Sequence, residues 1–321
     1  MLNVINSVVT AEKIVKKNLA IKPQEEVVIV ADSKSDLEIV YTLAGVIKSV
    51  GAEYTIAIMP DRDHSNAAIL TNFINKGLES ADVLIGLTSA SGAPCYSEVA
   101  QQLFYSGKVR SMSMVFRNLN HLTEGGATAD YDKIAEKASK LASIWKKGKE
   151  IRVKSEKGTD IKAPIVKERV RVEDGFATNP GDECAFSDGE VFMYPVAGAD
   201  GLVVLDGPIY RFGLPMGPVK IEVNNGKAIS IEGGEEAGNQ LKEIVFSTKN
   251  ADNFAEFAIG LNPQSFKNGD FEEEKKALGN VHFALGKTPV VYSPIHMDLI
   301  MREGTVEIDD QIVLENGKLL V

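Results

Sequence analysis

The sequence has few of the features that mark specialised protein classes. It contains two cysteines, Cys95 and Cys184, in 321 residues, which is too few for a disulfide scaffold or for a zinc finger built from cysteines. No apolar run approaches the roughly 20 residues that a membrane-spanning helix needs, and the charged, amphipathic N-terminus does not resemble a signal peptide. These absences predict a cytoplasmic protein with no membrane partner.

Clusters of positive charge are also absent. The chain carries 35 basic and 45 acidic side chains, a net charge of −10, and it has no basic stretch of the kind that binds phosphates, so we expect no nucleic-acid partner. Histidine is scarce as well: His64, His121, His282 and His296 are the four in the sequence. Any imidazole chemistry must draw on these four residues.

The first half alternates short apolar segments with segments of helical periodicity, which predicts an α/β domain: a mostly parallel sheet with helices on its faces. A helix over 131–147, capped by Asp130, ends in lysines, and we place a domain boundary near residue 150. The loop 86–94 matches no nucleotide-binding motif. We expect strands at 26–31, 53–59, 82–87 and 110–116, and helices at 37–50, 65–79 and 96–106.

The second half, residues 151–321, is dominated by strand signals. Asn225-Gly226 and Asn316-Gly317 each lie between two strand segments, and an Asn-Gly pair in that position is the strongest short hairpin signal. One helix is expected at 234–246. This half therefore predicts a β-rich α+β domain, with an antiparallel sheet or an open barrel, and we expect it to bind the metal discussed below.

Polar groups interrupt two apolar strands near the C-terminus. In the segment 294–301, alternation places His296 and Asp298 on the same face, and a carboxylate there must be paired or coordinated. In the segment 280–286, His282 shares its face with Ala284 and a glycine, which leave room beside the imidazole. For His282 alone, a core histidine bonded to a carbonyl is the alternative.

Two glutamates add acidic groups to the same half. Glu256 interrupts an apolar stretch in which it is expected to share a face with Phe254, and Glu190 begins a strand after a Ser-Asp-Gly turn. A salt bridge and an exposed strand start, respectively, are the alternatives. Two histidines and three carboxylates together have the composition of a site for one or two divalent first-row metals.

The same segments resemble the M29 family of metallo-aminopeptidases, of the aminopeptidase T and aminopeptidase S type. The resemblance covers roughly the last 190 residues and includes Gly158-Thr159-Asp160. The segments that carry it further are GEVF at 189–192, EGGEEAGNQL at 232–241, AEFAIGLNP at 255–263, VHFALG at 281–286 and SPIHMDLIM at 293–301.

This resemblance implies an aminopeptidase in which two divalent ions (zinc, cobalt or manganese) share a water that attacks the N-terminal peptide bond. A small peptide substrate and a homodimer are also implied. Glu183, Asp182 and Glu274 are candidates for a general base. By motif, the metal ligands are Glu190, Glu256, His282, His296 and Asp298.

The sequence departs from the family in one place. Longer relatives carry a tyrosine shortly after the His-x-Ala-Leu-Gly motif, whereas here the stretch is GKTPVV and the next tyrosine is Tyr292. Two alternatives therefore stay open. His282, His296 and Asp298 form a two-histidine, one-carboxylate set that suits mononuclear non-haem iron(II), and ring-cleaving dihydroxypyridine dioxygenases are similar in these motifs. The other alternative is a non-catalytic metal-binding relative.

Overall fold

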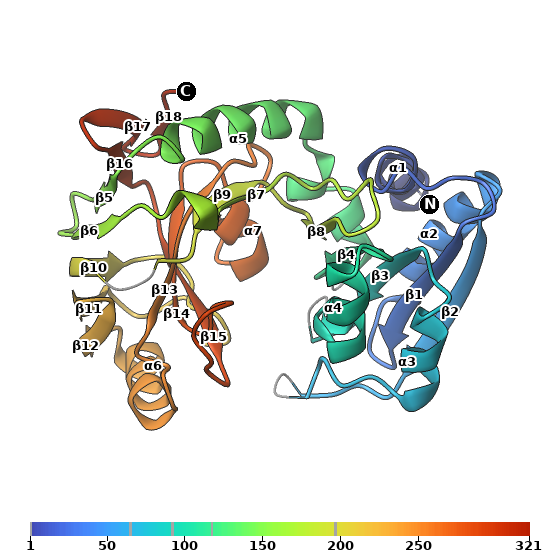
Figure 1. Cartoon of the computed structure of the whole chain (residues 1–321), viewed down its shortest axis with the longest axis horizontal. Helices are drawn as coiled ribbons and strands as arrows, with labels where there is room; N and C mark the ends of the chain where they lie inside the picture. The colour runs from blue at the N-terminus through green and yellow to red at the C-terminus, as the bar shows by residue number, and fades with distance from the viewer. Residues whose placement is uncertain (1, 64–65, 91–92, 117, 196–197) are drawn as a thin grey trace. The chain divides into compact units, whose positions relative to one another are not determined.

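The computed structural model describes residues 2–63, 66–90, 93–116, 118–195 and 198–321, and these divide into two compact units (Figure 1). Unit 1 comprises 1–128 and 173–188, and unit 2 comprises 129–172 and 189–321. The division does not coincide with the single boundary expected near residue 150. The helix over 131–145 belongs to unit 2, and the chain returns to unit 1 for one further strand.

Unit 1 is built on a parallel sheet, as its alternating pattern predicted. The described strands run in the order β2-β1-β3-β4-β8, with all neighbours parallel. Four expected strands are confirmed, whereas β8 was not predicted because its residues lie in the β-rich half of the sequence. The strands are β1 (Glu26–Asp32), β2 (Glu53–Met59), β3 (Val83–Leu87), β4 (Arg110–Met114) and β8 (Glu183–Phe186).

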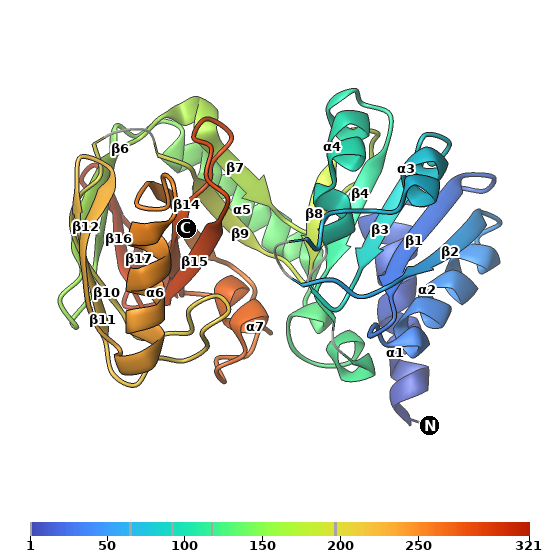
Figure 2. The same ribbon diagram turned by 90° about the horizontal axis from the view of Figure 1, so that it is seen from below.

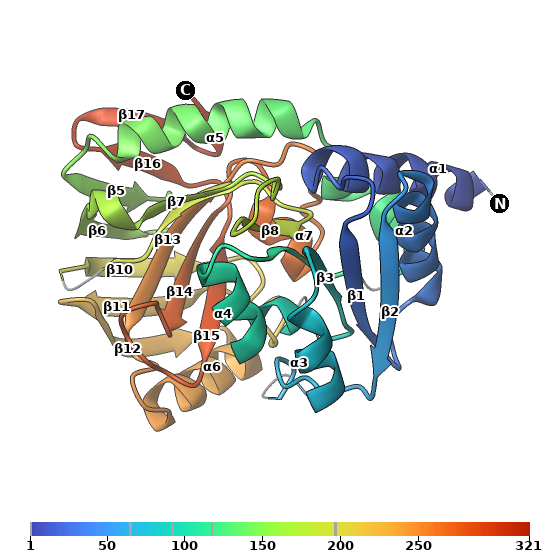
Figure 3. The same ribbon diagram turned by 45° about the vertical axis from the view of Figure 1, so that its right-hand side comes forward.

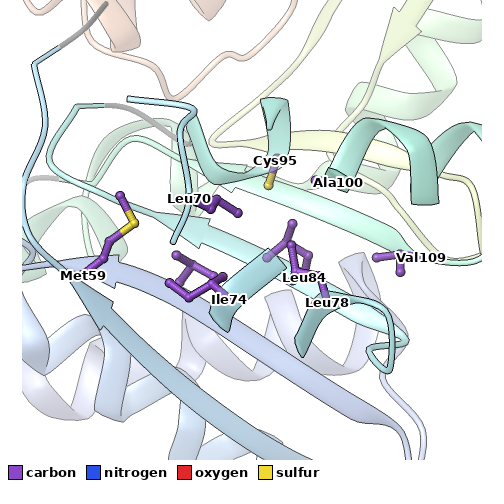
Figure 4. Packing of buried hydrophobic residues seen from close by; sticks show 9 residues of the cluster. Met59, Leu70, Ile74, Leu78, Leu84, Cys95, Ala100 and Val109 are labelled. Atoms are coloured by element: carbon purple, nitrogen blue, oxygen red, sulfur yellow. The ribbon is translucent and has the colours of Figure 1, made fainter. Parts of the chain in front are cut away.

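Helices cover both faces of this sheet. Figure 2 shows α3 and α4 on one face and α1 and α2 on the other. The core beneath α3 and α4 is apolar: Ile74 and Leu78 pack with Leu84 of β3 and with the buried thiol of Cys95 (Figure 4). That environment supports an incidental, packed role for Cys95. The helices are α1 (Leu2–Lys13), α2 (Leu37–Ser49), α3 (Asn72–Leu78) and α4 (Glu98–Tyr105).

Unit 2 is β-rich, as predicted, with two antiparallel sheets. The larger sheet contains both expected hairpins: Asn225 and Gly226 join β11 to β12, Asn316 and Gly317 join β17 to β18, and all four residues have positive φ, as Asn-Gly turns require. Its described strands, in spatial order, are β12 (Lys227–Gly233), β11 (Val219–Asn224), β10 (Asp200–Leu205), β6 (Asp160–Pro164), β5 (Glu150–Lys154), β16 (Thr305–Ile308), β17 (Gln311–Glu315) and β18 (Lys318–Leu319).

The smaller sheet of unit 2 places β13, β14 and β15 side by side (Figure 3). One face of β13 and β14 carries Phe257 and Phe283, whose rings lie 5.5 Å apart and are fully buried. The other face carries Glu256 and His282. The described strands, in spatial order, are β15 (His296–Met301), β14 (Val281–Gly286), β13 (Phe254–Gly260), β9 (Glu190–Met193) and β7 (Val170–Glu173).

Three helices complete unit 2: α5 (Tyr131–Trp145), α6 (Glu235–Ser247) and α7 (Phe271–Lys276). The predicted apolar face of α5 is confirmed, since Ile134, Leu141 and Trp145 are buried. Asp130 is the residue that precedes the first turn, but its side chain makes no capping hydrogen bond. None of the helices in the described part of the chain combines the length and the apolar character that crossing a membrane demands.

The C-terminal end of α7 approaches β13 at Gly260. A Cβ at this position would lie 2.4 Å from the carbonyl oxygen of Ala277 and 2.9 Å from the carbonyl carbon of Lys276. Both atoms belong to the backbone, so they cannot move aside as a flexible side chain does. Glycine is therefore required here for the close approach of α7 and not for a special φ angle.

We expect Gly260→Ala to lower the free energy of unfolding by about 1–3 kcal/mol, the usual cost of forcing extra volume into a packed core. The measurement is equilibrium urea unfolding. Gly45→Ala is the control, because Gly45 lies in α2 and a Cβ added there would meet no atom within 4 Å, and alanine should stabilise that helix by about 1 kcal/mol. Equal effects of the two substitutions would contradict the packing argument.

Candidate metal centre

The five predicted ligand residues lie on adjacent strands of the smaller sheet in unit 2. Glu256 of β13 is opposite Ala284 of β14, which is in turn opposite Asp298 of β15. His282 is opposite Ala258 in the neighbouring row. Directly opposed residues project from the same face of an antiparallel sheet, so the small alanines leave open space between the longer ligand side chains.

The remaining two residues reach the same face from the edges of this group. Glu190, the first residue of β9, is opposite Gly260, and His296, the first residue of β15, is opposite Gly286. Both opposing residues are glycines and therefore have no side chain to block the approach. The predictions that His282 and Ala284 share a face, and that His296 and Asp298 share a face, are confirmed.

One detail of the predicted alternation is wrong. Glu256 was expected to share a face with Phe254, but the register of β13 shifts between these two residues, and such a bulge reverses the side-chain alternation. The ring of Phe254 instead packs 5.1 Å from Phe257 and 5.7 Å from Phe283, on the apolar face. The bulge thus lets an aromatic anchor and a carboxylate leave the strand in opposite directions.

The side chains of the five residues form a continuous chain of short contacts. The Nε2 atom of His282 lies 3.3 Å from Glu190 Oε2 and 3.1 Å from Glu256 Oε1. The Nε2 atom of His296 lies 3.8 Å from Glu256 Oε2 and 3.0 Å from Asp298 Oδ1. Ligand atoms of Glu190, Glu256 and His282 all lie within 4.8 Å of one another, close enough to hold one metal ion.

This cluster is largely buried and reaches solvent at His296. Glu190, Glu256, His282 and Asp298 are buried, whereas the His296 side chain is 37% exposed. Burying three carboxylates without compensation would be very costly. The side of the cluster at His296 is therefore its solvent-exposed side.

Two buried oxygens that face histidines support a metal role for this cluster. Glu190 Oε2 lies 3.3 Å from His282 Nε2 and Asp298 Oδ1 lies 3.0 Å from His296 Nε2, and Glu190 Oε2 accepts no hydrogen bond from the described residues. Buried polar atoms normally have partners, and a shared cation is the partner that a carboxylate oxygen and an imidazole nitrogen have in common. The residues present therefore fit a divalent metal.

His296 is held in an orientation that suits metal binding. Its Nδ1 lies 2.8 Å from the carbonyl oxygen of Lys287, and a carbonyl can only accept, so Nδ1 carries the proton and donates it there. Metal-bound histidines usually make this kind of hydrogen bond through the second ring nitrogen. Nε2 is then the atom directed at Asp298 and Glu256.

Two lysines at the end of α7 reach the cluster, and they were not predicted as part of the site. Lys276 Nζ lies 2.7 Å from Glu190 Oε1, and Lys275 Nζ lies 2.7 Å from Asp298 Oδ2. In the sequence they resemble the basic residues that commonly end a helix. Only the fold brings them to these carboxylates, because Glu190 lies 86 residues before Lys276 (276 minus 190) and Asp298 lies 23 residues after Lys275 (298 minus 275).

The ionisation of the cluster reflects these neighbours. Burial alone would lower the pKa of His296, but the Asp298 and Glu256 carboxylates outweigh burial and raise that pKa to about 9. Burial would raise the pKa of Asp298, but Lys275 and His296 hold it well below its usual range. Without a metal, therefore, Asp298 is a carboxylate and His296 is a cation at neutral pH.

The proposed general bases have other environments. Both oxygens of Glu274 accept from the guanidinium of Arg302, at 2.6 and 2.8 Å, and Glu274 is fully buried. Asp182 accepts from the backbone N–H groups of Thr178 and Asn179. These hydrogen bonds give Glu274 and Asp182 structural roles. Glu183 lies on β8 in unit 1, whereas the five ligand residues are in unit 2.

The sequence contains two further histidines. His121 lies in unit 1, and its ring centroid is 6.0 Å from that of Phe116. His64 lies outside the described residues.

Glu183 allows a test of stability against pH. Burial, with Glu173 nearby, raises its pKa to about 7, so folding favours the protonated form. The stabilisation is full below the unfolded-state pKa near 4.5 and is lost as the pH rises through 7. Between pH 5 and 8, we expect the wild type to lose on the order of 2 kcal/mol more stability than Glu183→Gln.

The measurement is urea unfolding across that pH range. The control is Glu98→Gln, at an exposed position on α4, and it should keep the wild-type profile. Parallel profiles for the wild type and Glu183→Gln would show that Glu183 does not bind its proton more tightly in the folded state.

The chain is similar to a known protein family and to solved structures. The family model described as NicX: 2,5-dihydroxypyridine 5,6-dioxygenase matches residues 10–321. A solved structure of 2,5-dihydroxypyridine dioxygenase from Pseudomonas putida KT2440 is 18% identical, with a TM-score of 0.81, and the similarity covers 98% of this chain and 97% of that one.

A second similar structure, wild-type AmpT from Thermus thermophilus, is 16% identical, with a TM-score of 0.70 and 99% coverage of both chains. Comparison with curated protein sequences finds no match. At these identities the two structures show that the fold is shared, and the family match adds a relationship along nearly the whole chain.

Proposed function

The chain belongs to the 2,5-dihydroxypyridine 5,6-dioxygenase family, and from this membership and the site geometry we propose that it opens the ring of a dihydroxypyridine or a related dihydroxylated aromatic compound. The proposed metal is one iron(II) ion, and the co-substrate is dioxygen. One carbon–carbon bond of the ring breaks, dioxygen is reduced, and both oxygen atoms enter the product, so no further reductant is needed. The aminopeptidase expected from the sequence becomes the second candidate.

The balance of charge in the cluster is the observation that favours one metal ion. The cluster contains three carboxylates, and two lysine ammonium groups lie 2.7 Å from two of them, Glu190 and Asp298. This leaves a formal charge of −1 when both histidines are neutral. One divalent ion brings this to +1, whereas two would bring it to +3 in a buried site. Buried charge must be compensated, so the observed residues support a mononuclear site.

The roles of the residues follow from their positions. His282 and His296 would supply neutral nitrogen ligands through Nε2, and Asp298 would complete the two-histidine, one-carboxylate set typical of non-haem iron(II). Glu190 and Glu256 would supply further negative charge beside the ion. When bound, iron(II) supplies the one-electron chemistry by which dioxygen reacts with an aromatic ring. The Lys287 carbonyl orients His296, and the exposed side of His296 is where we place substrate entry.

A two-metal aminopeptidase that acts on small peptides remains the second candidate. Three carboxylates can bridge two ions, and the fold is shared with AmpT. Against it are the two lysines and the stretch GKTPVV in place of the expected tyrosine. The two candidates differ in metal count, in metal identity and in the bond that is broken.

The first test is turnover by protein loaded anaerobically with iron(II). We expect loss of the aromatic absorbance of 2,5-dihydroxypyridine together with uptake of one dioxygen per ring. His282→Ala should lower kcat by at least about 100-fold because it removes a buried ligand. Lys154→Met, which breaks the Lys154–Glu307 ion pair in the larger sheet of unit 2, is the control and should keep the wild-type rate.

Amino-acid p-nitroanilides are assayed in parallel with zinc, cobalt and manganese. Hydrolysis of these substrates without ring opening would replace the dioxygenase proposal by the aminopeptidase. An iron-loaded protein that consumes neither class of substrate would support the non-catalytic alternative.

The second test is the effect of metal removal on stability. A ligand that binds only the folded state adds about 2.7 kcal/mol at a free concentration 100 times its Kd. We therefore expect chelation to lower the unfolding temperature of the wild type and to leave that of His282→Ala nearly unchanged. The measurement is thermal unfolding with and without chelator, and an unchanged transition in the wild type would argue against a bound metal.

A further inference from the structure

We propose that Lys275 and Lys276 restrict this centre to a single divalent ion, because their fixed ammonium groups neutralise two of its three carboxylates and hold one oxygen of each. This inference rests on the metal centre in the proposed function and assigns a role to two residues outside the ligand set. The two lysines act as positioning residues, since they contact the ligands and not the reacting atoms.

Each lysine contacts one oxygen of a ligand carboxylate, and the other oxygen of that carboxylate faces a histidine. In Glu190, Oε1 contacts Lys276 Nζ, whereas Oε2 faces His282. In Asp298, Oδ2 contacts Lys275 Nζ, whereas Oδ1 faces His296. One oxygen of each group is thus directed at a histidine, and the other is held by a lysine, so neither carboxylate offers both of its oxygens to metal ions.

The two lysine–carboxylate ion pairs are largely buried, so a cation from solution cannot easily displace the ammonium groups. The side chain of Lys276 is 6% exposed and that of Glu190 is 3% exposed; the corresponding values for Lys275 and Asp298 are 19% and 9%. Both ion pairs are thus largely shielded from solvent.

The backbone fixes the place from which the lysines act. The carbonyl of Lys276 accepts from the N–H of Asn262, and the side chain of Asn280 donates to the carbonyl of Glu274. These bonds fix the last turn of α7 against β13, where Gly260 permits the close approach. From there Lys276 reaches β9 and Lys275 reaches β15, on opposite sides of β13 and β14.

A second divalent ion would meet unfavourable charge. It would lie near the first ion and near two ammonium groups, and Glu256 is the one ligand carboxylate among the described residues with neither oxygen held by these lysines. Replacing both lysines by methionine removes the two charges while keeping similar unbranched side chains, so the carboxylates then require a new partner. The chemistry that fits is a second divalent cation.

The experiment measures metal stoichiometry and affinity, with manganese(II) and cobalt(II) as probes. Isothermal titration and elemental analysis should give one ion per chain for the wild type and two for K275M/K276M, with the second ion binding at least about 10-fold more tightly than any second ion in the wild type. K275R/K276R keeps both positive charges and should bind one ion per chain, as the wild type does.

The matched control is K154M. Lys154 is paired with Glu307, at 2.9 Å, in the larger sheet of unit 2, so this variant removes a lysine–carboxylate pair away from the ligand strands. It should bind one ion. Circular dichroism and urea unfolding establish that each variant is folded before titration.

Two results would overturn the inference: two ions in the wild type, or a folded K275M/K276M that still binds one ion with unchanged affinity. If the double variant does not fold, K275M alone decides the question, because Lys275 is the less buried of the two; two ions support the inference and one ion overturns it. A wild type that binds one ion but opens no ring rejects the proposed function and leaves this inference standing.

Discussion

The need to neutralise three carboxylates on one face of a β-sheet governs the design of unit 2. Glu190, Glu256 and Asp298 are all buried, and in a protein interior each must be paired or coordinated. Two imidazoles, from β14 and β15 of the same sheet, and two ammonium groups from α7 lie beside these carboxylates. Small residues opposite the ligands and a glycine beneath the helix end follow from the same requirement, because the charged groups must reach one another closely.

The apolar and polar faces of this sheet depend on each other. Phe254, Phe257 and Phe283 pack on one side of β13 and β14, and this packing fixes strands whose opposite sides carry Glu256 and His282. The bulge between Phe254 and Glu256 lets Phe254 project from the aromatic face and Glu256 from the ligand face. The aromatic core therefore holds the ligand atoms in place without contacting them, as preorganised sites require.

Local patterns in the sequence predicted much of this arrangement. Alternation placed His282, His296 and Asp298 on their faces, and the Asn-Gly pairs located both hairpins of the larger sheet. The bulge before Glu256 could not be predicted, because alternation assumes an uninterrupted strand. Lys275 and Lys276 were missed for a different reason: their function depends on a long-range approach of α7 to β13, and nothing in their immediate neighbours records it. The same limit hid β8, a strand of unit 1 that is encoded among residues of the other half.

The position of β8 also has a consequence for how the protein is made. Its partner β4 ends at Met114, and β8 begins at Glu183, 69 residues later (183 minus 114). On the ribosome, the parallel sheet of unit 1 therefore stays open at β4 until α5, β5, β6 and β7 have been synthesised. An unpaired strand edge can pair with other chains. Pairing of β8 with β4 is slow, because bringing together segments so far apart in the sequence costs chain entropy. The order of the chain thus couples completion of the first unit to synthesis of the early part of the second.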